Sequence, residues 1–259
     1  MTFIDTHCHL YDEAFDADRD EAVKRAVDAG VTTMLLPDID STSTARLDTL
    51  ANAYPQHFCR MAGLHPTSVK EDFERELELV HSSLITHHSS PKYVAVGEIG
   101  MDLYWDRTYE EQQREVLRRQ MLWAIELGLP VCLHIRKAHN EVFGLLRDIN
   151  KASYSGVMHC FGGSVQEAQR AVEMGFHLGI GGVVTYKNAT MAEVVKALPL
   201  ERLLLETDAP YLTPVPYRGK RNESAYTPII AQRIADLRGI TLDEVATQTT
   251  ANARSLFSL

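Results

Sequence analysis

Short apolar runs, rich in β-branched residues or leucine, alternate along this chain with amphipathic segments of helical period. The apolar runs predict eight strands, at Phe3–His7, Thr32–Leu36, Phe58–Gly63, Tyr93–Gly97, Val131–His134, Gly156–His159, His177–Gly179 and Arg202–Glu206. The segments between them predict helices that include Asp16–Ala29, Thr42–Ala53, Phe73–His87, Tyr109–Leu127, Asn140–Asn150 and Val165–Met174. Strands that alternate with helices are typical of an α/β protein with a parallel sheet.

Glycine and serine residues support several of these boundaries. Gly30, Gly128 and Gly175 each follow a predicted helix, where glycine commonly ends one. Ser164 directly precedes another predicted helix and is expected to be its N-cap. The seventh strand is the weakest prediction, because glycines crowd the segment and make it short and turn-like.

The eight strand–helix pairs predict a (β/α)8 TIM barrel. A doubly wound open sheet is the alternative, but it would not readily bring polar residues from the first and last strands together. The sequence contains no evident repeat, linker or low-complexity segment. We therefore expect one domain over residues 1–259, a length common for barrels of this kind.

Histidines and carboxylates follow or close several predicted strands. His7 and His9 are two positions apart, so on a strand they point to the same face. Glu98, His134, His159 and Asp208 occupy the ends of four further strands. A closed barrel would bring all six side chains to one rim. Four imidazoles and two carboxylates exceed what one tetrahedral zinc ion takes and suit two divalent ions that share a bridging carboxylate.

Three acidic residues on the predicted strands have different expected environments. Glu98 follows the apolar run Val94–Val96, and a buried carboxylate needs a cationic partner, which favours a metal bridge. Asp5 shares the face of the two histidines; it accepts a proton from a ligand imidazole or is a simple buried acceptor, and both readings stay open. Glu206 is expected to form a structural ion pair or to orient a ligand rather than bind metal.

Composition and charge narrow the possible partners. Hydrophobic residues make up 45% of the chain, yet no apolar run approaches the ~18 residues of a membrane span. The first residues lack the features of a signal peptide, so a cytoplasmic location is expected. The net charge of −9 argues against holding duplex DNA by general phosphate neutralisation, so a nucleic-acid substrate must be held locally. No obligate protein partner is evident.

The four cysteines, Cys8, Cys59, Cys132 and Cys160, form no CxxC pair. They are expected to be free, small buried hydrophobes. Cys8 and Cys160 each adjoin a candidate ligand histidine, but strand alternation turns them to the opposite face.

Taken together, the motifs resemble those of the TatD family of metal-dependent hydrolases. The resemblance rests on Asp5–His9, Gly97–Asp102, Leu133–Arg136, Met158–Phe161 and Leu205–Tyr211, and on the later segments Arg218–Asn222 and Asn252–Phe257. These segments run from the first strand to the last helix, and their combination is specific although each one alone is weak.

The resemblance implies a (β/α)8 barrel with a two-metal site. It implies His7, His9, Glu98 and Asp208 around one ion, with Glu98, His134 and His159 around the other. Some family members are DNases that act on strand ends, which implies phosphodiester hydrolysis. Ser224 stands where the family often has proline, and Leu103–Trp105 is a variant of the usual aromatic pair. Neither departure touches a proposed ligand, so both concern the substrate rather than the metals.

The residues also indicate a mechanism. Asp208 is expected to hold the attacking water and accept its proton, and His65 to meet the phosphate or the leaving oxygen. Zinc, manganese and magnesium are all compatible with this donor set. The expected substrate is DNA or a nucleotide phosphodiester. The alternative is an amidohydrolase-type enzyme that cleaves a small amide, lactone or ester, although that class often uses a carbamylated lysine where this chain has Glu98.

Basic and aromatic residues near the predicted rim have open roles. Arg136 is either an anion clamp or part of a surface salt bridge. The cluster of Arg218, Lys220 and Arg221 either contacts phosphates or is a solvated loop. Tyr104 and Trp105 either stack on a nucleobase or pack under a loop. His57, His81, His87, His88, His139 and His177 are expected to be structural or exposed.

Overall fold

Eight parallel strands form a single sheet in sequential order in the computed structural model, which describes residues 1–86, 93–149, 154–187 and 190–259. The strands are β1 Phe3–Asp5, β2 Val31–Leu36, β3 Phe58–Ala62, β4 Tyr93–Asp102, β5 Val131–Arg136, β6 Gly156–Met158, β7 Phe176–Ile180 and β8 Leu203–Leu205. Hydrogen bonds join the first and last strands, from Thr6 N to the Leu205 carbonyl (2.9 Å) and from Asp208 N to the His7 carbonyl (2.9 Å). The sheet thus curls into the expected (β/α)8 barrel.

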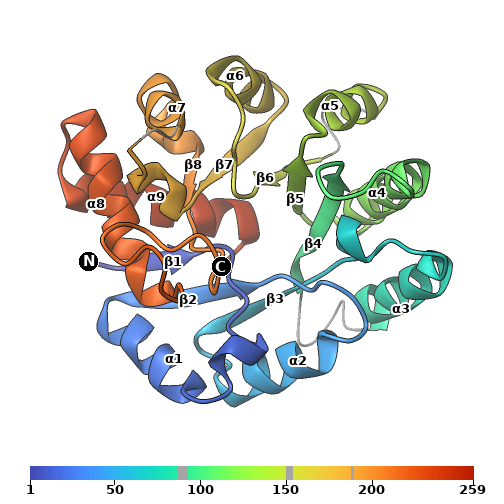
Figure 1. Cartoon of the computed structure of the whole chain (residues 1–259), viewed down its shortest axis with the longest axis horizontal. Helices are drawn as coiled ribbons and strands as arrows, with labels where there is room; N and C mark the ends of the chain where they lie inside the picture. The colour runs from blue at the N-terminus through green and yellow to red at the C-terminus, as the bar shows by residue number, and fades with distance from the viewer. Residues whose placement is uncertain (87–92, 150–153, 188–189) are drawn as a thin grey trace.

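Helices surround the strands as a ring (Figure 1). They are α1 Arg19–Asp28, α2 Thr44–Ala53, α3 Phe73–Thr86, α4 Glu110–Leu127, α5 His139–Arg147, α6 Val165–Glu173, α7 Met191–Ala197, α8 Thr227–Arg238 and α9 Leu242–Phe257. Ser164 caps α6 in a capping box with Glu167, as predicted. The predicted helix ends at His87 and Asn150 lie outside the described residues, as does His88.

One apolar cluster fills the barrel interior, because most strands point one side chain toward the axis. Its members are Ile4, Leu35, Met61, Ala95, Cys132, Val157 and Leu204 from the strands, with Ala253 and Phe257 from α9. The last helix therefore packs against the inside of the barrel and helps to close it. The candidate site residues lie at the other, carboxyl end of the strands.

Several predicted strand boundaries were wrong, and the differences concern the candidate site. β4 continues to Asp102 instead of ending at Gly97, so Glu98 lies within a strand rather than at its end. The pairing of β4 with β5 shifts register between Val96 and Ile99, an irregularity that sequence periodicity does not reveal. Conversely, β8 ends at Leu205, so Asp208 lies in the loop that follows.

No helix in the described part of the chain is both long and apolar enough to cross a membrane.

Candidate metal centre

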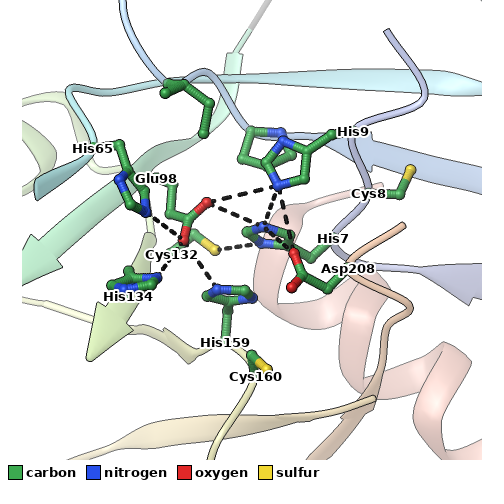
Figure 2. A network of polar contacts seen from close by, with 12 residues as sticks. His7, Cys8, His9, His65, Glu98, Cys132, His134, His159, Cys160 and Asp208 are labelled. Carbon is green, nitrogen blue, oxygen red and sulfur yellow. Dashed lines mark hydrogen bonds and ion pairs between the residues drawn. The ribbon is translucent and has the colours of Figure 1, made fainter. Parts of the chain in front are cut away.

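Glu98 is the centre of the cluster at the carboxyl end of the barrel (Figure 2). The residue is 2% exposed, and the two oxygens of its carboxylate face different sets of side chains. Oε1 lies 2.9 Å from His134 Nδ1, 2.9 Å from His159 Nε2 and 3.3 Å from His65 Nε2. Oε2 lies 3.2 Å from His7 Nε2 and 3.9 Å from His9 Nε2. One carboxylate thus connects two groups of imidazoles.

The second group contains His7, His9 and Asp208. The Nε2 atoms of the two histidines are 3.2 Å apart, which confirms that they converge. Asp208 Oδ1 lies 3.5 Å from His9 Nε2 and 3.7 Å from His7 Nε2. Asp208 has a positive φ of 57°, an unusual backbone conformation for a residue other than glycine, and its N–H donates to the His7 carbonyl. This turn after β8 brings the carboxylate back over the β1 end.

The network around His9 fixes which nitrogen carries its proton. The Tyr11 hydroxyl donates to the Pro37 carbonyl (2.6 Å), so its oxygen accepts from His9 Nδ1–H (2.8 Å). The His9 Nε2 lone pair therefore faces the carboxylates of Glu98 and Asp208. His134 instead lies between two carboxylates, with its Nε2 3.0 Å from Asp102 and its Nδ1 2.9 Å from Glu98. Burial alone would lower the pKa of His134, but the hydrogen bonds with Asp102 and Glu98 raise it.

Lone pairs and carboxylate oxygens that face one another repel unless a proton or a cation lies between them. Burial alone would raise the pKa of Glu98, but the charges of His159, His65 and His7 hold it well below its usual range. Burial alone would lower the pKa of His159, yet Glu98 and Glu206 raise it well above normal. Three groups of described residues have ligand atoms close enough to hold a metal ion, and these donors fit divalent cations.

His65 differs from the other imidazoles in this cluster. Its Nδ1 accepts a hydrogen bond from the Thr67 backbone N–H (3.1 Å), so the neutral ring carries its proton on Nε2. That proton points to Glu98 Oε1. His65 is therefore arranged as a donor rather than as a metal ligand, although it is within reach of a metal shared by Glu98 and His134.

Outer contacts hold the cluster in place, and sequence reasoning found only part of them. Asp102, in the motif after Glu98, was missed; it is 2% exposed and accepts from His134. Cys132 was expected to be only a buried hydrophobe, but its sulfur lies 3.3 Å from His7 Nδ1. Glu98 and Asp102 are four positions apart on β4, so the alternation of side chains places them on the same face once the strand is extended to Asp102.

The structure decides between the two readings of Asp5. Its carboxylate accepts from Thr207 Oγ1 (2.6 Å) and from the backbone N–H groups of Thr207 and His7 (2.9 and 3.3 Å). These contacts fasten the β1 end to the β8 end, so Asp5 is a buried acceptor rather than an imidazole partner. Burial raises the pKa of Asp5 to about 7.

Glu206 lies beneath His159, with its Oε1 3.5 Å from His159 Nδ1. It also accepts from the Cys160 backbone N–H, at 2.5 Å. A Cβ on Gly179 would come within 2.0 Å of Glu206 Oε2, so glycine at that position makes room for the buried carboxylate. This arrangement agrees with an orienting role, although the ligand atoms of Glu206, His7 and His159 are also close enough to hold an ion.

The cysteines take no direct part in the metal-capable groups of the described residues. All four are free, as expected. Cys8 points away from the cluster and is buried, whereas Cys59 and Cys160 are only half-buried.

A cavity of about 1260 Å³ opens above the cluster. His9, His65, Glu98, His134, His159 and Asp208 all line it. His139, which was expected to be structural or exposed, lines it too. Among the described residues, the arginine and lysine side chains that line the cavity are those of Arg136 and Lys137. Sequence reasoning missed Lys137.

The Arg218, Lys220 and Arg221 cluster lies outside the lining of the cavity. Arg221 donates to both carboxylate oxygens of Asp18, at 2.6 and 2.8 Å, and to the Ala14 carbonyl at 2.7 Å. Arg221 is therefore not a freely solvated side chain, because its guanidinium holds the loop against the segment before α1. Arg218 stacks on Tyr186 at 4.5 Å.

A (β/α)8 barrel whose strand ends gather buried imidazoles and carboxylates in one cavity is the architecture of a metal-dependent hydrolase. The model of the family described as TatD related DNase matches residues 4–258. This chain belongs to that family.

Three relatives illustrate the likeness. An uncharacterized metal-dependent hydrolase, YabD of Bacillus subtilis, is 39% identical over 256 residues, with 98% of each chain covered. A 3'-5' ssDNA/RNA exonuclease, TatD of Erwinia amylovora, is 36% identical, with 98% of this chain and 99% of the relative covered. The crystal structure of the TatD homologue YjjV from Escherichia coli has a TM-score of 0.91 at 34% identity, covering 99% of this chain and 98% of that one.

Proposed function

We propose that this protein is a phosphodiesterase that acts on DNA ends or single strands through two divalent metal ions. The observation that carries the proposal is the division of the Glu98 carboxylate, whose Oε1 faces His134 and His159 while Oε2 faces His7. A carboxylate with donors on both sides suits a bridge between two ions. His9 and Asp208 complete the side that contains His7.

When bound, such ions supply Lewis-acid activation of the phosphoryl oxygen and of the attacking water. Asp208 is the residue best placed to receive the proton of that water, because it lines the cavity and its side chain is 15% exposed. Burial alone would raise the pKa of Asp208, but the hydrogen bond with His9 and the charges of His159 and His7 lower it, so the carboxylate is ionised. Across the cavity, the His65 Nε2–H, which points to Glu98 Oε1 in this structure, turns to donate to the phosphate or to the leaving oxygen when substrate binds.

The nucleic-acid substrate is supported by the names of relatives and by the charge of the cavity wall. The Erwinia amylovora relative carries the name of a single-strand exonuclease. Arg136 and Lys137 give the cavity wall two cationic side chains in a protein of net charge −9. Few phosphates can therefore be neutralised, which favours a strand end or a single strand over a long duplex.

The test is a substrate panel with purified, metal-loaded protein. The panel contains a chromogenic phosphodiester, end-labelled single-stranded DNA, the same sequence as a duplex, and a set of lactones. We expect hydrolysis of the phosphodiester and shortening of the single strand. The slope of log affinity against log salt should be about −1.4 to −2.1, which corresponds to about two or three phosphates on a single strand. Hydrolysis of lactones alone, or tight duplex binding with a steep slope, would contradict the proposal.

A further inference from the structure

Two large aromatic side chains lie exposed just beyond β4. Trp105 is 70% exposed and Tyr104 is 51% exposed. This exposure rules out the reading in which they pack under a loop. Their rings meet edge to face with centroids 4.9 Å apart. The Arg136 guanidinium lies 4.0 Å from the Tyr104 ring centroid and 5.0 Å from that of Trp105, so the indole is held in place from two directions.

Hydrogen bonds connect this aromatic pair to the cluster around Glu98. Asp102 Oδ1 accepts from the Tyr104 backbone N–H (2.9 Å), while Oδ2 lies 3.0 Å from His134 Nε2. The Leu103 N–H donates to the Arg136 carbonyl (2.9 Å), which joins the end of β4, next to the aromatic pair, to the end of β5, which carries Arg136. Trp105, Arg136 and His134 line the same cavity. A ligand whose phosphate lies at the cluster can therefore extend to the indole.

We propose that the exposed surface of Trp105 stacks on an unpaired nucleobase of the substrate, next to the phosphate that is cleaved; this rests on the proposed function. Tyr104 and Arg136 support the indole, and Arg136 and Lys137 face the neighbouring phosphate. A flat aromatic surface beside two cations is complementary to a base and its anionic backbone. The same surface would not distinguish one base from another, because every base presents a π-face.

This subsite also gives a physical reason for a single-strand preference. In a duplex, both faces of an internal base are covered by its stacked neighbours, so the indole can reach a base only after unstacking. A single strand or a frayed end presents a base without that cost. Arg136 cannot provide the selection itself, because phosphates are present in both forms of DNA.

The experiment uses fluorescence, because the chain has two tryptophans. In a metal-loaded Trp123→Phe variant, Trp105 is the remaining reporter. It is titrated with phosphorothioate oligothymidylate, which resists hydrolysis, and with an abasic phosphorothioate strand of equal length and charge. We expect the base-containing strand to quench Trp105 and to bind more tightly than the abasic strand.

The affinity of two matched variants completes the test. Trp105→Ala should weaken binding of oligothymidylate by about 5- to 150-fold, the range for losing one base–aromatic stack, and should leave binding of the abasic strand unchanged. Trp123→Ala is the control, since Trp123 stacks on His81 away from the cavity. Equal binding of the two strands, or a Trp105→Ala variant that binds like the control, would overturn the subsite while phosphodiester hydrolysis stands. Wild-type protein that neither binds nor cleaves any strand would overturn the proposed function as well.

Discussion

Replacing Glu98 with glutamine is the most direct test of the metal bridge. The substitution keeps the shape of the side chain but removes its negative charge, which now lies within 3.2 Å of imidazole nitrogens on both sides. An amide can offer its oxygen to one side alone. Changes in outer contacts of a metal ligand cost about 10–100-fold in affinity, and loss of a charged bridge should cost at least that for each ion. Per ion, this corresponds to at least about 1.4–2.7 kcal/mol.

The assay is the metal content of the protein after equilibration with a competing chelator over a range of free metal concentrations. We expect Glu98→Gln to lower occupancy by both ions, whereas His159→Ala should mainly lower occupancy by one. Glu141→Gln is a matched control, because Glu141 lines the same cavity without belonging to the metal-capable groups. Circular dichroism checks that each variant is folded. If Glu98→Gln and His159→Ala each lose a single ion to the same extent, Glu98 does not bridge.

Three further predictions concern residues around the cluster and in the supporting structure. Asp102→Asn should weaken metal binding by about 10–100-fold on the His134 side while the His7 side stays unchanged, as measured by the same chelator competition; equal losses on both sides would contradict an orienting role for Asp102. Arg221→Ala should lower the free energy of unfolding, measured in urea, by about 1–3 kcal/mol, because it breaks the charged contacts with Asp18. It should leave the slope of log DNA affinity against log salt unchanged. Arg218→Ala is the control and should have a smaller effect on stability, because Arg218 only stacks on Tyr186. Burial and the charge of Arg202 lower the pKa of His177 to about 4, so the unfolded chain binds the extra proton between about pH 4 and pH 6.5. The stabilising contribution of neutral His177 is therefore present above about pH 6.5 and lost as the pH falls to about 4. In urea titrations over this range, His177→Gln should remove up to about 3 kcal/mol of the pH dependence of the free energy of unfolding. A variant with the same pH profile as the wild type would refute this role of His177.

The sequence by itself determined the barrel and the donor types of the candidate site. Apolar runs that alternate with amphipathic segments specify β- and α-periods locally, and the parallel (β/α)8 arrangement follows from their order. The spacing of His7 and His9 predicted correctly that they converge, although β1 ends at Asp5 and both histidines lie in the segment that follows it. Both of these properties depend on neighbours in the sequence.

The tertiary structure alone decided the contacts that depend on register and on loop conformation. The shift between β4 and β5 places Glu98 among five imidazoles and Asp102 beside His134, and pairing between distant strands cannot be read from local periodicity. Asp208 reaches the cluster through a turn with positive φ rather than at the end of a strand. The same limitation explains Arg221, since only the folded chain brings it to Asp18, 203 residues away in sequence, and gives its guanidinium a structural contact.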